Sequence, residues 1–165
     1  NSDGTKILQT NNDDIRAYTL STAWDLTTVS AYSNTQHINI TATTATPNVH
    51  YDQLHDGSWS DDGSKLYLID HQCYIHRWDA VKPYELKGMY KYISNAADTS
   101  TKGPKYAIRT STVDSGSPAS TGRSRGLQVS NDGLNVYWTN YDNDRIYQAV
   151  LGTAHDLSSK TSSTN

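Results

Sequence analysis

The sequence of 165 residues contains no phenylalanine, four prolines and a single cysteine. With only Cys73, an internal disulfide framework and a cysteine-based zinc site are excluded. Charged residues are scarce at 19%, and their balance gives a net charge of −3. Without an excess of positive charge, nothing favours binding to nucleic acid or to anionic lipid. No apolar run approaches the roughly 18 residues of a membrane span, so we expect no membrane insertion.

Uncharged polar and aromatic residues dominate what is present. The sequence holds 20 threonines, 19 serines, 12 tyrosines and four tryptophans. Threonine, tyrosine and tryptophan favour strands, while serine, asparagine, aspartate and glycine favour turns. The composition therefore predicts an all-β chain and excludes a helical bundle. The chain begins at Asn1 without a methionine, which favours a processed product or a piece of a longer protein.

Three stretches of the chain repeat one pattern. Each contains an Asp-Gly pair, an isoleucine and, nine residues beyond it, a triplet of ring, acid and leucine. The isoleucines lie 60 and 71 residues apart, at Ile15, Ile75 and Ile146. The triplets are Trp24-Asp25-Leu26, Tyr84-Glu85-Leu86 and His155-Asp156-Leu157. The shared spacing indicates an internal repeat.

Each copy is predicted to form short antiparallel strands joined by tight turns. Asp-Gly pairs are strong turn signals, and short apolar or alternating runs follow them, as in residues 65–68 and 75–78. Further short strands are expected around residues 57–60 and 126–130, and after the first two triplets within residues 29–40 and 87–93, so that a full copy holds four strands. Radial packing of such sheets gives a β-propeller, in which each blade buries its faces against its neighbours.

The predicted fold is therefore all-β, with about three propeller-type blades, each a four-stranded antiparallel sheet, in one repeat domain or fragment over residues 1–165. The expected ranges are about 1–45 for blade 1, 56–95 for blade 2, 95–125 for an insertion and 126–165 for blade 3. The first and last blades are expected to be incomplete. Because open edges invite strand pairing, other copies of the chain or neighbouring subunits are the expected partners.

One motif carries a family resemblance. The run Leu20-Ser21-Thr22-Ala23-Trp24-Asp25-Leu26, with the Ser-x-Asp-Gly turns of the other copies, resembles a family of β-propeller repeats in phage virion proteins and bacterial surface proteins. The resemblance covers about half of the chain, mainly the repeat cores. Tyr84 and His155 depart from it, because the pattern has tryptophan there. It implies a propeller architecture and a structural or attachment role, and hardly specifies an activity.

Candidate ligand-binding residues lie on the predicted loop face. The insertion is rich in serine, threonine, glycine and proline and should share this face with the middle hairpin turns of the three copies. Loops gathered on one side of a rigid scaffold often carry binding sites. The candidates are Asp13, His71, Arg109 and Asp142. A solvated loop face without a ligand is the alternative interpretation.

The triplets admit two interpretations. Their rings could stack on a sugar while the acids bind its hydroxyl groups. Alternatively they are structural corners, which their recurrence in every copy favours, because a ligand site usually occurs in one specialised copy. The residues concerned are Trp24, Asp25, Tyr84, Glu85, His155 and Asp156.

No cofactor, metal site or catalytic site is predicted. The Asp- and Asn-rich turns match no ordered calcium loop, and the histidine pairs 50/55 and 71/76 have an odd spacing that places them on opposite faces of a strand. No nucleophile elbow, zinc-protease helix or phosphate-binding loop occurs, and Cys73 has no activating pattern nearby. Asn39-Ile40-Thr41 is an N-glycosylation acceptor.

The residues and the resemblance together predict a non-enzymatic structural or attachment protein of a virion or an extracellular assembly. The alternative is a lectin module that binds cell-surface glycan in a defined pocket. A fragment of a glycan-processing enzyme is a third interpretation, which requires acids converging from several blades.

Overall fold

The computed structural model is all-β throughout the residues that it describes. It contains three antiparallel sheets and two 3₁₀ turns, η1 (Leu26–Thr28) and η4 (Leu157–Ser159), with no α-helix in the described part of the chain. The all-β prediction is thus confirmed. The described residues are 3–11, 14–31, 36–39, 54–70, 74–86, 90–91, 108–109, 124–141 and 144–164.

Consecutive strands pair within each sheet, as tight turns after short strands dictate. The first sheet has the order β1-β2-β3, the second β4-β5-β6-β7 with β8 also paired to β6, and the third β9-β10-β11-β12. The strands of the first sheet are β1 (Lys6–Asn11), β2 (Asp14–Thr19) and β3 (His37–Asn39). Those of the second are β4 (Leu54–Trp59), β5 (Lys65–Asp70), β6 (Tyr74–Asp79), β7 (Tyr90–Lys91) and β8 (Ile108–Arg109). Those of the third are β9 (Ser124–Val129), β10 (Asn135–Asn140), β11 (Arg145–Leu151) and β12 (Lys160–Thr164).

The sheets follow the sequence repeat. An Asp-Gly turn precedes β1, β5 and β10, and the repeat isoleucine lies in β2, β6 and β11. In the described residues the first sheet has no strand equivalent to β4 and β9, as predicted. The prediction of an incomplete last copy is wrong, because β12 pairs with β11 and completes four strands. Its sequence, Lys-Thr-Ser-Ser-Thr, has no apolar residue, and the backbone hydrogen bonds of a strand do not require one.

Two short strands share the outer edge of β6 in the second sheet. β7 pairs with its C-terminal end, where Trp78 faces Lys91. β8 comes from the predicted insertion and pairs with the N-terminal end, where Tyr74 faces Arg109. The position of a fourth strand beside β6 is therefore shared by β7 and by β8, which is a part of the insertion.

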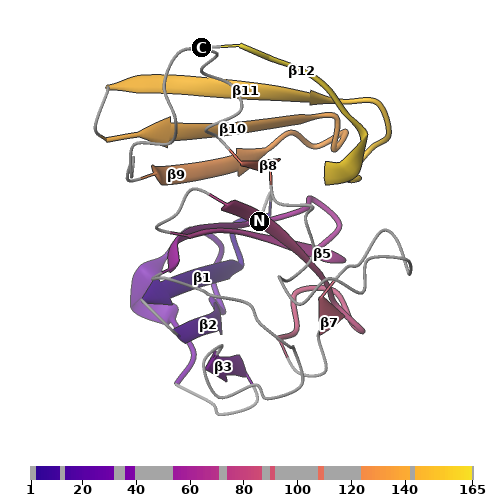
Figure 1. Cartoon of the computed structure of the whole chain (residues 1–165). Coiled ribbons are helices and arrows are strands. Elements are labelled where there is room, and N and C mark those ends of the chain that lie inside the picture. Colours follow the sequence, from indigo (N-terminus) through magenta and orange to yellow (C-terminus); the bar gives the residue numbers. More distant parts are fainter. Residues whose placement is uncertain are drawn as a thin grey trace.

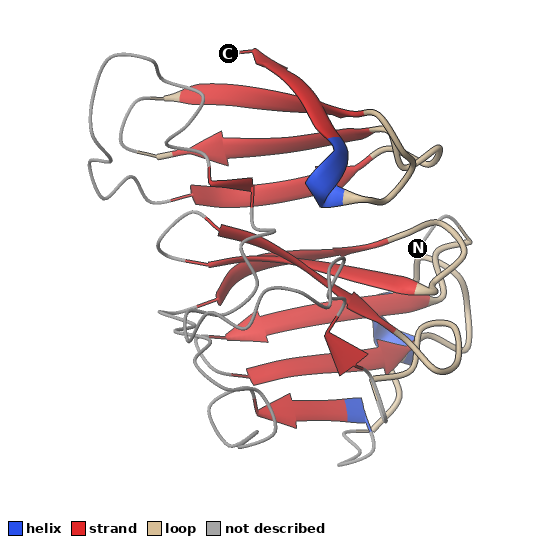
Figure 2. Cartoon of the chain, turned by 45° about the vertical axis from the view of Figure 1, so that its right-hand side comes forward, coloured by secondary structure: helices blue, strands red, loops and turns tan. Residues whose placement is uncertain are grey.

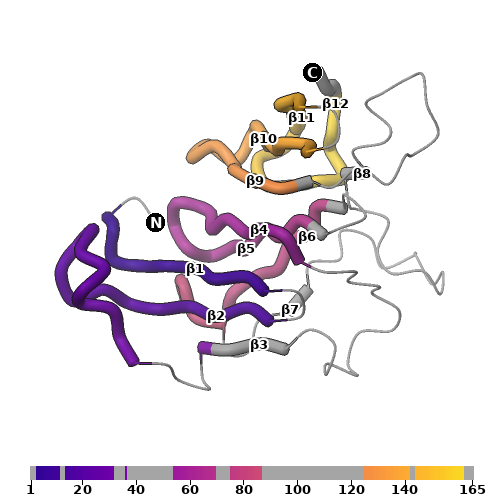
Figure 3. Tube along the Cα trace, turned by 90° about the vertical axis from the view of Figure 1, so that its left-hand side faces the viewer, coloured from indigo at the N-terminus to yellow at the C-terminus, as the bar shows by residue number. Residues whose placement is uncertain are grey.

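The three sheets are stacked as layers with the second sheet in the middle (Figure 1). β4 lies against β1 on one side and against β9 on the other, as Figure 3 also shows. The Asp-Gly turns and the triplet corners gather at one end of the stack, where Figure 2 shows most of the tan loops. We call the sheet face that carries the repeat isoleucine the forward face, and the opposite one the rear face.

The forward face of each sheet packs on the rear face of the next. Between the first two sheets, Ile15 meets Leu66, Leu68 and Trp78, all at most 5% exposed. The sheets approach closely there, since a Cβ placed on Gly57 would lie 2.7 Å from a methyl of Leu8. Between the second and third sheets, the core comprises Tyr67, Ile69 and Ile75 packed with Leu127, Val129, Val136, Trp138, Tyr147, Ala149, Leu151 and Leu157. The middle sheet is therefore buried on both faces.

Candidate functional sites at the junctions between repeats

Each repeat has a corner in which the ring of the triplet covers the glycine of the Asp-Gly turn. In the second repeat, Gly63 and Tyr84 both have left-handed backbones, with φ of 68° and 60°. Tyr84 N–H donates to the carbonyl of Gly63 at 2.9 Å, and a Cβ on Gly63 would lie 2.4 Å from the tyrosine ring. Only glycine fits under the ring. The equivalent pairs are Gly4 with Trp24 and Gly133 with His155.

The acids of the first and third triplets cap the 3₁₀ turns that follow them. Asp25 Oδ1 accepts from the backbone N–H of Thr27 at 2.9 Å, and Asp156 Oδ1 accepts from that of Ser158 at the same distance. Hydrogen bonds from the side chain and backbone of Thr27 lower the pKa of Asp25. Glu85 differs, since its carboxylate lies 4.0 Å from the ammonium of Lys82. Two of the three acids are thus engaged in turn geometry.

The aspartate of the second Asp-Gly turn is also committed to its own loop. Asp62 Oδ1 accepts from Ser60 Oγ at 2.7 Å and from the backbone N–H of Ser64 at 3.0 Å. Partial burial alone would raise the pKa of Asp62, but these hydrogen bonds and the nearby Lys65 outweigh it and lower the pKa to about 2. The carboxylate is ionised at neutral pH and holds the turn.

A polar cluster bridges the second and third repeats. Tyr67 in β5 places its hydroxyl 2.8 Å from Nδ1 of His155, and the two rings are stacked. Arg77 in β6 donates to the backbone carbonyl of His155 at 2.7 Å and pairs with Asp79 at 2.9 Å. Burial and the charge of Lys65 lower the pKa of His155, which favours the neutral imidazole over the imidazolium. This cluster fastens the corner of the third repeat to the forward face of the second.

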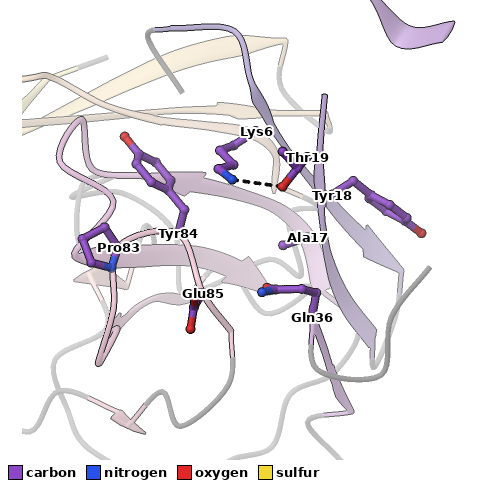
Figure 4. A pocket seen from close by; sticks show the side chains of 8 residues that line it. All are labelled: Lys6, Ala17, Tyr18, Thr19, Gln36, Pro83, Tyr84 and Glu85. Atoms are coloured by element: carbon purple, nitrogen blue, oxygen red, sulfur yellow. Dashed lines mark hydrogen bonds between the residues drawn. The ribbon is translucent and has the colours of Figure 1, made fainter. Parts of the chain in front are cut away.

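The junction between the first and second repeats holds a polar pocket of about 250 Å³ instead. Figure 4 shows its lining, with the ammonium of Lys6 donating to Thr19 Oγ1 at 2.9 Å and the Tyr18 side chain pointing away. The Gln36 side chain bridges the junction, since its Oε1 accepts from the backbone N–H of Leu86 at 3.3 Å. The lining residues are Lys6, Ala17, Tyr18, Thr19, Gln36, Pro83, Tyr84 and Glu85.

Strand register shows how the described side chains of the two junctions differ. Arg77 pairs with Tyr67 across β5 and β6, and Ala17 pairs with Leu8 at the same point of β1 and β2. Alanine thus occupies the position from which Arg77 reaches the next corner. Thr19 likewise replaces Asp79, the ion-pair partner of that arginine. Ala17 and Thr19, at the positions equivalent to Arg77 and Asp79, both line the pocket.

Most of the predicted ligand-binding residues fall outside the described residues. This applies to Asp13, His71 and Asp142, and to Cys73. Arg109 is described only by its backbone in β8, which places it beside the N-terminal end of β6. Asn39 is the last residue of β3, where it faces Asp14. The structure therefore does not bring the four candidates into one described site.

Sequence reasoning missed the residues that make the junctions, above all Tyr67, Arg77 and Ala17. Alternation in β6 places Arg77 on the same face as Ile75, and that was the available signal. The contact with His155 spans 78 residues of sequence and could be found only once the sheets were stacked.

No described helix is long and apolar enough to cross a membrane. Among the described residues, no three histidine, cysteine, aspartate or glutamate side chains lie together as metal ligands would. Comparisons of the chain with protein-family models, with curated proteins and with solved structures give no match.

Proposed function

We propose that the chain is a non-enzymatic structural or attachment module of a virion or an extracellular assembly, built from propeller-type repeats. The observation that carries the proposal is the directional stacking of the three sheets, forward face on rear face, at both junctions. Contact is concentrated on β1, β4, β5 and β9, as expected for blades that converge on an axis. The polar side chains described above serve turns and junctions, which suits a scaffold.

Surface labelling tests the location and role. Antibodies raised against the chain should bind the outside of intact source cells or particles without permeabilisation. The matched control is the same antiserum depleted with the purified chain, which should lose the signal. Labelling that appears only after permeabilisation would contradict an extracellular or virion role.

One observation favours the alternative of a glycan-binding module. The pocket at the first junction combines the Tyr84 ring with an ammonium, an amide, a hydroxyl and a carboxylate, from Lys6, Gln36, Thr19 and Glu85. Monosaccharide sites pair an aromatic ring with such polar groups. On a glycan array, saturable binding to one sugar class that is lost in Glu85→Ala and retained in Glu85→Gln would support this alternative. Absence of binding to every glycan on the array would contradict this alternative and leave the structural role as the proposal.

A further inference from the structure

We propose that the two outer faces of the stack bind each other between copies of the chain, so that a second copy completes a closed ring of six sheets. The inference rests on the proposed structural role and specifies its partner. Within the described residues, the forward face of the third sheet and the rear face of the first have no sheet packed on them. Each is the counterpart of a face that is buried elsewhere in the same chain.

The repeat isoleucines give the clearest sign. Ile15 and Ile75 occupy equivalent positions on the forward faces of the first and second sheets, and they are 1% and 0% exposed. Ile146 occupies the same position in the third sheet and is 69% exposed. The third repeat thus has an isoleucine at this register position, although no sheet in the described residues covers it. Solvent-facing strand positions usually carry polar residues.

Tyr137 extends this exposed surface. It pairs with Gln148 at the same register position at which Tyr67 pairs with Arg77. Tyr67 is fully buried under the corner of the next repeat, whereas Tyr137 is 36% exposed. Tyr137 thus presents a hydroxyl and a ring where Tyr67 binds a corner.

The first sheet offers the complementary surface. Its corner ring, Trp24, is 74% exposed, whereas the equivalent His155 is stacked on Tyr67. On its rear face, Ile7 and Tyr18 pair with each other at the register position of the buried pair Leu66 and Trp78. Suppose that the third sheet of one copy packs on this rear face as the second sheet packs on the third within a chain. Trp24 would then take the place of His155 and lie on Tyr137 of the other copy. The indole N–H can donate only, and a tyrosine hydroxyl can accept.

The charges on the two faces permit this contact. Arg16, on the rear face, is paired with Asp14, and the forward face around Ile146 carries the uncharged Tyr137 and Gln148. A forward face on a rear face is a head-to-tail contact, which closes into a ring when the rotation per sheet allows. Two copies supply six sheets, which falls within the roughly four to eight blades of known propellers. Both outer faces of both copies would then be buried.

Light scattering after size exclusion, over a range of concentrations, tests the inference on the whole chain. The wild type should be a dimer, twice 18.3 kDa. Ile146→Asp places a charge in the contact and should weaken the dimer about tenfold or more. The matched control is Val81→Asp, because Val81 is 65% exposed and lies outside both faces. It should dimerise like the wild type, and all three proteins should show the same far-UV circular dichroism.

Mixing two variants tests the head-to-tail order. Tyr18→Asp disables the rear face, so at a concentration where the weakened dimer dissociates, it and Ile146→Asp should each be monomeric alone. Mixed, they retain one intact pair of faces and should form a heterodimer. A wild-type monomer at every concentration, or a dimer that Ile146→Asp and Val81→Asp affect equally, would overturn the inference. Oligomers beyond two that Ile146→Asp abolishes would overturn closure at two copies. None of these results alters surface labelling, which tests the proposed function separately.

Discussion

At the scale of single residues, the corners show why the Asp-Gly pair recurs. The glycine must adopt a left-handed backbone and also leave room for a ring that lies directly on it. The ring itself varies between tryptophan, tyrosine and histidine. The space under the ring is therefore fixed more strictly than the chemistry of the ring.

Replacing Gly63 by alanine tests this requirement. Its φ of 68° strains an L-residue, and the added methyl would meet the Tyr84 ring at 2.4 Å. We expect the free energy of unfolding to fall by about 2–4 kcal/mol. Gly126→Ala is the control, since its nearest side-chain atom would be 3.4 Å away and its φ is not left-handed. Urea unfolding measures both, and an equal loss in the two variants would contradict the account.

The corner histidine makes the second junction sensitive to pH. The pKa of His155 lies below its ordinary 6.5 in the folded protein. As the pH falls through about 6.5, the unfolded chain therefore takes up the proton first, and the free energy of unfolding decreases until the folded protein is protonated too. Protonation also makes Nδ1 of His155 a donor in its contact with the Tyr67 hydroxyl.

His155→Tyr should reduce this pH dependence, because tyrosine already occupies the equivalent corner at Tyr84. Between about pH 7.5 and 5.5, the wild type should lose more thermal stability than the variant. Melting temperatures across this interval measure the difference. Parallel melting curves for the two proteins would show that the other histidines account for any pH effect.

At the scale of elements, stability depends on the side chains that join one sheet to the next. The second junction uses the Arg77–Asp79 pair, whose side chains are 10% and 14% exposed. Arg77→Ala would leave Asp79 without this partner and remove a donor to the His155 carbonyl. We expect a loss of about 2–4 kcal/mol in chemical unfolding. Lys82→Ala is the control, because its pair with Glu85 is exposed and should contribute less than about 1 kcal/mol.

The first junction allows the reverse experiment. Ala17→Arg with Thr19→Asp would rebuild in the pocket the pair found at the second junction. The double variant should gain about 0.5–1 kcal/mol over the wild type, and Ala17→Arg alone should gain less. Thermal and urea unfolding of the wild type, Ala17→Arg, Thr19→Asp and the double variant measure this. A double variant no more stable than the sum of its single changes would show that the introduced arginine and aspartate do not form the pair.

The strands differ in how far the sequence predicts them. β5, β6, β10 and β11 follow apolar or alternating runs after Asp-Gly turns, so their pattern is visible. β12 escaped prediction because serine and threonine carry no hydrophobic period, and its pairing with β11 is made by the backbone. β8 is only two residues long and is positioned by β6 rather than by its own sequence. Edge strands whose position depends on pairing with a neighbouring strand are therefore difficult to predict from their own sequence.

At the scale of the whole molecule, burial is concentrated in the middle sheet. Leu66, Tyr67, Leu68 and Ile69 are consecutive and at most 1% exposed, because β5 packs on sheets at both faces. We predict that backbone amides of β5 exchange with solvent more slowly than those of β2 or β11. Hydrogen exchange followed by mass spectrometry measures this, with a dilute Ile146→Asp sample as the monomeric reference. Slowest exchange in β11 of that variant would contradict the prediction.

The candidate sites were less predictable than the fold. The triplets and Asp-Gly pairs were visible because they recur at fixed spacing. The pocket and the Tyr67–His155–Arg77 cluster were not, since each depends on which face of a sheet meets the next repeat. Nothing in the sequence marks Ala17 as important, and its role follows only because it occupies the register position equivalent to that of Arg77.

The forward-on-rear order of the sheets also bears on how such a chain can change over generations. Because each repeat presents a rear face to its predecessor and a forward face to its successor, duplicating or deleting one whole repeat in the gene leaves a matching face at each new boundary. The number of repeats can then change by unequal recombination without requiring a new hydrophobic core. Point substitutions, such as the difference between Ala17 and Arg77 at equivalent positions, would afterwards make the contacts at each boundary different.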